Sequence, residues 1–172
     1  MTDIAGQPTT ARPSVERYGL APADTAVRFT TRHLLGLSAV TGTVGLAAGS
    51  VTVRDGELLG IEVELDMASF ESASRARDRA VASERLLHVD AHPRATYRST
   101  GVERRDGGWL VHGELTARGV PAPLDLLVDA LDPAADGRVH ATARVDRFDH
   151  GITLPTALAA RHLQVDVTTR VR

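Results

Sequence analysis

Three side chains of types that bind metal ions alternate in the middle of the chain, at His88, Asp90 and His92. Imidazole and carboxylate groups are ligands of zinc and iron, and alternate residues of an extended segment lie on one face. Pro93 follows at once, however, and no distant side chain stands out as a further ligand. We therefore interpret the segment as a polar loop, with a metal-dependent enzyme built on the three residues as the alternative.

A second polar group, formed by Asp146, Asp149 and His150, combines the carboxylate and imidazole functions used in general acid–base catalysis. No serine accompanies it in the Gly-x-Ser-x-Gly context of a hydrolase nucleophile. The chain also contains neither lysine nor cysteine, which excludes covalent catalysis through an amine or a thiol. We therefore predict that the protein is not an enzyme and requires no cofactor.

The composition limits the kinds of partner. A length of 172 residues suffices for one domain with a buried core. The formal net charge is −2, with 20 basic and 22 acidic residues mixed along the chain, so no overall field attracts nucleic acid. The aromatic side chains number 1 Trp, 2 Tyr and 3 Phe, too few for a base-stacking surface. We expect no nucleic-acid partner.

The N-terminal residues differ from the rest of the chain. Residues 1–14 contain an early acidic residue, two prolines and no apolar block, so we predict a disordered tail, no secretory signal and a folded domain at 15–172. No segment approaches the roughly 20 apolar residues of a membrane span. We expect a cytoplasmic protein.

The polar groups must be positioned by β-strands, because apolar residues recur with a period of two along most of the chain. We predict eight strands, at about 27–30, 37–53, 61–65, 94–103, 109–118, 120–130, 138–147 and 162–171. One short helix is predicted between Ser69 and Asp90, with Ser72 or Ser74 as its N-cap. Strands at this spacing indicate an antiparallel sandwich or barrel. A barrel of eight strands is either filled by side chains or holds one small ligand.

The stretch 113–126 is the most informative segment. Its alternating residues predict two strands, and Arg118-Gly119 predicts a sharp turn between them, because glycine adopts positive φ at no steric cost. Pro121 and Pro123 stiffen the second strand. The stretch reads G-x-L-T-x-x-G-V-x-x-P-x-x-L.

This pattern and three other segments together resemble the YceI-like family, over about residues 18–170. The other segments are Val27-Arg28-Phe29-Thr30-Thr31-Arg32-His33-Leu34 with Val40-Thr41-Gly42; Arg77-Asp78 with Ser83, Leu86-Leu87, Pro93, Tyr97 and Ser99-Thr100; and Arg144-x-Asp146-x-Phe148-x-x-Gly151-Ile152 with Arg147 inserted. The resemblance implies an all-β, eight-stranded antiparallel lipocalin-like barrel. The short helix predicted from the residues then forms an insertion between the third and fourth strands. The resemblance also implies binding of a polyisoprenoid or other long-chain lipid lengthwise in the barrel, often in a homodimer, without catalysis.

We predict that a ligand would contact the inward faces of the strands. The candidates are Val27, Phe29, Ile61, Val63, Leu65, Leu115, Leu124, Leu126, Val128, Val139, Ala141, Ala143, Val145 and Val165, together with Phe148. Burying an apolar chain against them would gain about 25 cal/mol per Å². The alternative is that the same side chains fill the barrel, leaving an interaction module without a cavity. The small side chains of Ala141 and Ala143 favour a cavity.

His33, Arg77 and Asp78 are the candidates for contact with a polar head group. Arginine can bind a pyrophosphate through two parallel hydrogen bonds. The alternative for Arg77-Asp78 is that the pair fixes the inserted segment through hydrogen bonds.

Overall fold

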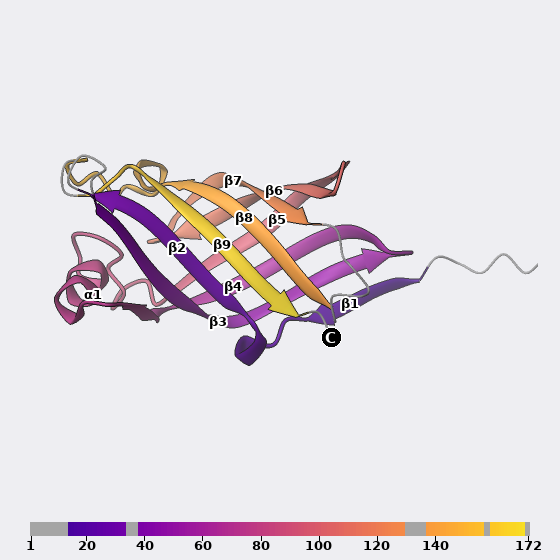
Figure 1. Cartoon of the computed structure of the whole chain (residues 1–172), viewed down its shortest axis with the longest axis horizontal. Helices are drawn as coiled ribbons and strands as arrows, with labels where there is room; N and C mark the ends of the chain where they lie inside the picture. The colour runs from indigo at the N-terminus through magenta and orange to yellow at the C-terminus, as the bar shows by residue number, and fades with distance from the viewer. Residues whose placement is uncertain (1–13, 34–37, 130–136, 157–158, 171–172) are drawn as a thin grey trace, which may run out of the picture.

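The computed structural model describes residues 14–33, 38–129, 137–156 and 159–170 (Figure 1). The strands are β1 (Val15–Gly19), β2 (Ala26–His33), β3 (Ser38–Arg54), β4 (Glu57–Ser72), β5 (Arg94–Arg105), β6 (Gly108–Ala117), β7 (Val120–Asp129), β8 (Arg138–Asp146) and β9 (His162–Arg170). The helices are α1 (Arg75–Ala82) and the short 3-10 helices η1 (Pro22–Asp24) and η3 (Arg147–His150). The predicted tail, apart from Ser14, lies outside the described residues.

Strands β2 to β9 form the closed antiparallel barrel of eight strands that the sequence predicts. Their order around the barrel is β3-β2-β9-β8-β7-β6-β5-β4, and the pairing of β3 with β4 closes it. Helix α1 lies between β4 and β5, which are the third and fourth barrel strands, as predicted. The additional strand β1 pairs with Ser50–Arg54 of β3. It lies on the same edge of β3 that β2 occupies further along, and it was not predicted.

The long strands β3 and β4 bend sharply to close the barrel. Their pairing shifts register at three places, between Thr43 and Gly45, between Leu46 and Ala48, and between Thr52 and Val53. Such irregularities increase the local twist and curvature of a strand. Gly45 of β3 lies at the first of these shifts, and a glycine inside a strand is typical of such a site.

The β6–β7 hairpin has the tight turn that its sequence predicts. Arg118 has φ 52° and Gly119 has φ 73°, so both central residues are left-handed, as in a type I′ turn. Arg118 also links neighbouring segments, because its guanidinium donates to the carbonyl of Gly151 at 3.0 Å and to that of Glu84 at 2.9 Å.

The two ends of the barrel differ, as Figure 1 shows. At one end, called here the α1 end, lie α1, the β6–β7 turn and η3. At the other, called the η1 end, lie η1 and the hairpins β3–β4 and β5–β6. Buried residues such as Val53, Leu58, Trp109 and Val111 form the core near the η1 end. No helix in the described ranges has the length and apolar character of a membrane-spanning helix.

His112 lies on the outer face of β6 between two carboxylates. Its Nδ1 is 2.8 Å from Asp125 Oδ1 and its Nε2 is 3.2 Å from Glu103 Oε1. Hydrogen bonds to Asp125 and then to Glu103 raise the pKa of His112 above its ordinary value of 6.5.

This arrangement predicts a specific pH dependence of stability. The pKa of His112 is higher in the folded than in the unfolded state, so its protonation stabilises the fold. This stabilisation is complete below the unfolded pKa of 6.5 and is lost as the pH rises through the higher pKa of the folded state. We expect urea unfolding at about pH 8 to give a lower free energy of unfolding than at about pH 6, and His112→Gln to reduce that difference. An unchanged difference in the variant would contradict the assignment.

Candidate functional site

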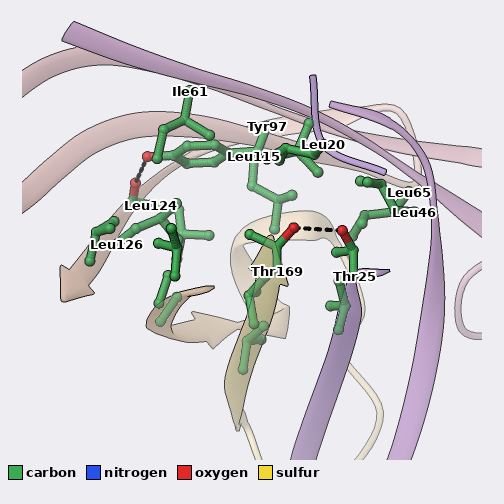
Figure 2. A pocket seen from close by; sticks show the side chains of 18 of the residues that line it. Leu20, Thr25, Leu46, Ile61, Leu65, Tyr97, Leu115, Leu124, Leu126 and Thr169 are labelled. Carbon is green, nitrogen blue, oxygen red and sulfur yellow. Dashed lines mark hydrogen bonds between the residues drawn. The ribbon is translucent and has the colours of Figure 1, made fainter. Parts of the chain in front are cut away.

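A cavity of about 140 Å³ lies inside the barrel (Figure 2). All of the aliphatic residues predicted to face inward line it, namely Val27, Ile61, Val63, Leu65, Leu115, Leu124, Leu126, Val128, Val139, Ala141, Ala143, Val145 and Val165. The other lining residues are Leu20, Thr25, Leu46, Val51, Tyr97, Val167 and Thr169. The barrel is therefore not completely filled by its side chains, and the role of these residues in binding remains a prediction.

The pairing of strands explains why so many small and aliphatic side chains meet. Residues directly opposite each other on neighbouring strands share one face of the sheet. Leu126 lies opposite Ala143, and Val128 lies opposite Ala141. Both alanines lie opposite valines of β9 as well. Two alanines in adjacent inward positions leave the space that larger residues would fill.

The polar groups on the cavity wall are engaged by the protein itself. The Tyr97 hydroxyl donates toward the carbonyls of Val111 at 3.1 Å and Leu124 at 3.3 Å. The hydroxyls of Thr25 and Thr169 are 2.7 Å apart, and Figure 2 shows this contact and that of Tyr97 with Leu124. Burial raises the pKa of Tyr97 well above its ordinary value, so the phenol is neutral. Such a wall suits a hydrocarbon group.

Several lining residues were missed from the sequence. Tyr97 lies directly opposite Leu115, and Ala95 and Tyr97 alternate with the polar Thr96 and Arg98, so period-two analysis of β5 could have found it. Leu20 lies between β1 and η1, where its backbone N–H donates to the carbonyl of Gly49 at 2.9 Å. It belongs to no alternating run, so the pattern carried no signal for it.

The two phenylalanines among the predicted ligand contacts do not line the cavity. Phe29 is not a lining residue and stacks on Phe70, with ring centroids 5.1 Å apart. Phe148 lies in η3, where the guanidinium groups of Arg147 and Arg161 are each 4.8 Å from its ring centroid. The period of two ends at Asp146 because η3 turns the chain, so alternation no longer decides the direction of the Phe148 side chain.

The proposed head-group residues do not line the cavity. The side-chain oxygen of Ser72, at the end of β4, donates to Asp78 Oδ1 at 2.6 Å and accepts from Arg77 Nη1 at 3.2 Å. Ser74 is the N-cap of α1, and its Oγ accepts from the Arg77 backbone N–H at 3.4 Å. These bonds fix the inserted helix against β4, as the structural alternative predicts. The side chain of His33 lies outside the described part of the structure.

The metal-binding alternative has no support in the described part of the chain. His88 and His92 are arranged edge to face, with ring centroids 5.7 Å apart. A side chain at Gly119 would lie 2.8 Å from Cε1 of His92, so the His92 ring packs against the β6–β7 turn. Within the described ranges, no three His, Asp or Glu side chains gather as a metal site requires.

Two side chains of the second polar group, Asp146 and His150, make hydrogen bonds within the protein. Asp146 accepts from the Phe148 backbone N–H at 3.0 Å and from Arg161 Nε at 2.7 Å. Burial opposes ionisation of Asp146, but these two hydrogen bonds outweigh it and lower its pKa. His150 is buried, with Nδ1 2.9 Å from the carbonyl oxygen of Val120. Both side chains hold η3 in place.

Comparisons with known proteins identify relatives that cover most of the chain. A UPF0312 protein of Shewanella sp. strain W3-18-1 is 29% identical over 154 residues, which make up 84% of this chain and 80% of the relative. A UPF0312 protein of Serratia proteamaculans is 27% identical over 150 residues, which make up 83% of this chain and 78% of the relative.

Solved structures share the fold. BcnA of Burkholderia cenocepacia has a TM-score of 0.73 at 15% identity, over 87% of this chain and 98% of that protein. A polyisoprenoid-binding domain from Saccharophagus degradans, implicated in plant cell wall breakdown, has a TM-score of 0.61 at 15% identity, over 90% of this chain and 97% of that domain. The model of the YceI-like domain matches residues 18–172, which include the whole barrel. The chain therefore belongs to the YceI-like domain family.

Proposed function

We propose that the protein binds a long apolar molecule, a polyisoprenoid or a related lipid, inside its barrel and stores or carries it without transforming it. The observation that carries the proposal is a cavity with aliphatic walls, whose Tyr97, Thr25 and Thr169 hydroxyls are already engaged within the protein. Such a site binds a ligand by burying its hydrocarbon surface and offers it few hydrogen bonds. The similar fold of a polyisoprenoid-binding domain supports the same class of ligand.

The size of the cavity limits how the ligand is held. An apolar cavity of roughly 150 Å³ takes up a molecule of the size of benzene, so a void of about 140 Å³ holds about one five-carbon unit. A longer chain needs additional room. Among the described residues, the shortest pairing in the barrel is that of β7 with β8, which covers Leu126 to Val128 on β7. We propose that the wall widens here, where Leu124 and Val145 line the cavity beyond the paired region.

The direct test is organic extraction of the purified protein followed by mass spectrometry. We expect a copurified long-chain lipid, or uptake of a prenol that is added to delipidated protein. Failure to retain or bind any such lipid would overturn the proposal.

Filling the cavity should remove binding while leaving the fold intact. Leu126→Trp places an indole in a half-buried inward position of β7, so we expect at least about a tenfold loss of affinity for an added prenol. Leu127→Trp is the matched control, because Leu127 is the next residue on the same strand and is 57% exposed. Titration with a fluorescent apolar probe measures both. Equal losses in the two variants would contradict a site inside the barrel.

The homodimer and the cytoplasmic location stay predictions. Multi-angle light scattering tests the first, and fractionation of cells that produce the protein tests the second.

A further inference from the structure

The stacked rings of Phe29 and Phe70 lie inside the barrel, at the α1 end of the cavity. Phe29 is two residues after Val27 on β2, so both side chains point to the same, inward face. Its direct partner on β9 is Val165, which lines the cavity. Phe29 is therefore one inward position nearer the α1 end than Val27.

The backbone of β3 is shaped to receive this ring. Gly42 is the direct partner of Phe29, and a Cβ atom built on Gly42 would lie 2.7 Å from Phe29 Cζ and 2.9 Å from the carbonyl oxygen of Glu71. The Phe29 ring thus occupies the space where a side chain at position 42 would stand. It crosses the inner surface of β3 to meet Phe70 of β4, with centroids 5.1 Å apart and planes inclined by 22°.

The pair spans three adjacent strands at one level of the barrel. Phe29 projects from β2, Gly42 of β3 lies beneath it, and Phe70 projects from β4. Both rings are half-buried, and the Phe29 ring contacts both the Phe70 ring and the backbone at Gly42. Two stacked rings form a rigid obstacle, because each side chain has only two rotatable bonds and the pair gains about 0.5–1.5 kcal/mol from its geometry.

We propose that the Phe29–Phe70 stack is the stop that limits how long a hydrocarbon chain the barrel accepts. This inference rests on the proposed function and specifies it. A chain extending along the cavity toward the α1 end meets the two rings at the level of Val165, the direct partner of Phe29. Each further isoprene unit adds affinity only while it can be buried, so the gain should end where the chain reaches the stack.

The test compares chain-length selectivity between variants. Geraniol, farnesol and geranylgeraniol differ by one isoprene unit each, and displacement of the fluorescent probe N-phenyl-1-naphthylamine measures their affinities. For the wild-type protein we expect the affinity to rise with chain length up to one member of the series and then to stop rising; we call this chain length the limit. For Phe29→Ala and Phe70→Ala we expect it to rise by at least one further unit, with at least about a tenfold gain for the first alcohol beyond the wild-type limit.

Two further variants keep the test decisive. Phe29→Leu preserves an apolar side chain and the fold, and should shift the limit less than Phe29→Ala. Phe148→Ala removes a ring at the same end of the barrel, but this ring belongs to η3 and lies against Arg147 and Arg161, so its loss should leave the limit unchanged.

The outcomes separate the stop from the proposed function. If the wild-type protein binds the alcohols but Phe29→Ala and Phe70→Ala have the same limit as the wild type, the proposal that the stack limits chain length is wrong. The proposed binding function then stands. An equal shift in Phe148→Ala would also overturn the stop, because it would indicate general loosening of the α1 end. If the wild-type protein binds none of the alcohols, the proposed function is wrong, and so is the inference about the Phe29–Phe70 stack that rests on it.

Discussion

Gly113→Ala is expected to destabilise the protein by about 3 kcal/mol or more, because the position has no room for a single methyl group. A Cβ atom built there lies 2.4 Å from both Cζ and the hydroxyl oxygen of Tyr97, and 2.7 Å from the carbonyl oxygen of Arg98. The Arg98 carbonyl belongs to the β5 backbone, which is paired with β4 and β6 on its two sides. Urea unfolding of the variant measures the loss.

The Tyr97 ring cannot move aside without further cost. Its hydroxyl is held by the carbonyls of Val111 and Leu124, and its ring forms part of the cavity wall. If the ring is displaced into the cavity, ligand binding should fall together with stability. Tyr97→Leu combined with Gly113→Ala should therefore recover part of the stability that Gly113→Ala loses, as a double-mutant cycle would show.

Gly101→Ala is the matched control for this prediction. Gly101 lies on β5 and pairs with β6, the strand that carries Gly113. The nearest atom to a Cβ atom built on Gly101 is Cδ2 of His112 at 3.9 Å, which is an ordinary contact. We expect a change of less than about 1 kcal/mol. Similar losses at positions 101 and 113 would mean that a general intolerance of glycine replacement in these strands, and not the Tyr97 contact, causes the effect.

Arg147→Met is the second substitution for which we expect a large effect, a loss of about 3 to 5 kcal/mol. Arg147 is 5% exposed, and burial lowers its pKa. Its Nε donates to the carbonyl of Ala160 at 2.9 Å and its Nη2 to that of Ala159 at 2.8 Å. Further bonds reach the carbonyls of Ile152 and Leu154. Methionine preserves the apolar stem but leaves these acceptors without a donor.

Arg161→Met provides the comparison, because Arg161 also lies over the Phe148 ring at 4.8 Å but is exposed and pairs with Asp146. The Arg161 side chain is 49% exposed and that of Asp146 is 16% exposed, so water screens the pair in part, and loss of Arg161 should cost less than loss of Arg147. Arg147→Lys should recover little, since one ammonium group cannot reproduce the fork of guanidinium donors. Thermal unfolding of the three variants gives the ranking, and a stable Arg147→Met protein would refute the structural role of Arg147.

Alternation alone predicted most of the cavity wall. Leu124, Leu126 and Val128 share one side of β7, and all three line the cavity. The same rule applied to Phe29 gave the correct face but not its neighbour, because contact with Phe70 depends on how far β4 curves. A period-two pattern determines on which face of a strand each side chain lies. It does not determine whether a side chain on that face meets empty space or another side chain.

Polar residues were harder to interpret from the sequence. Arg77 and Asp78 were compatible with a head-group site or with structural hydrogen bonds, and nothing in their spacing separated the two. The contacts with Ser72 depend on the angle at which α1 leaves β4. Arg147 was noted only as an insertion in the closing motif, since its burial arises when residues 152–156 and 159–160 fold around its side chain.

The pairing of β2 with β9 has a consequence for how the protein is made in the cell. Ala26–Thr30 pairs with Gln164–Thr168, so the first and last barrel strands in the chain are neighbours. The barrel cannot close until β9 has emerged from the ribosome, and closing so long a loop makes folding slow. Until then the aliphatic side chains that later face the cavity are exposed to solvent or to chaperones. The barrel therefore closes only after all eight of its strands have been synthesised.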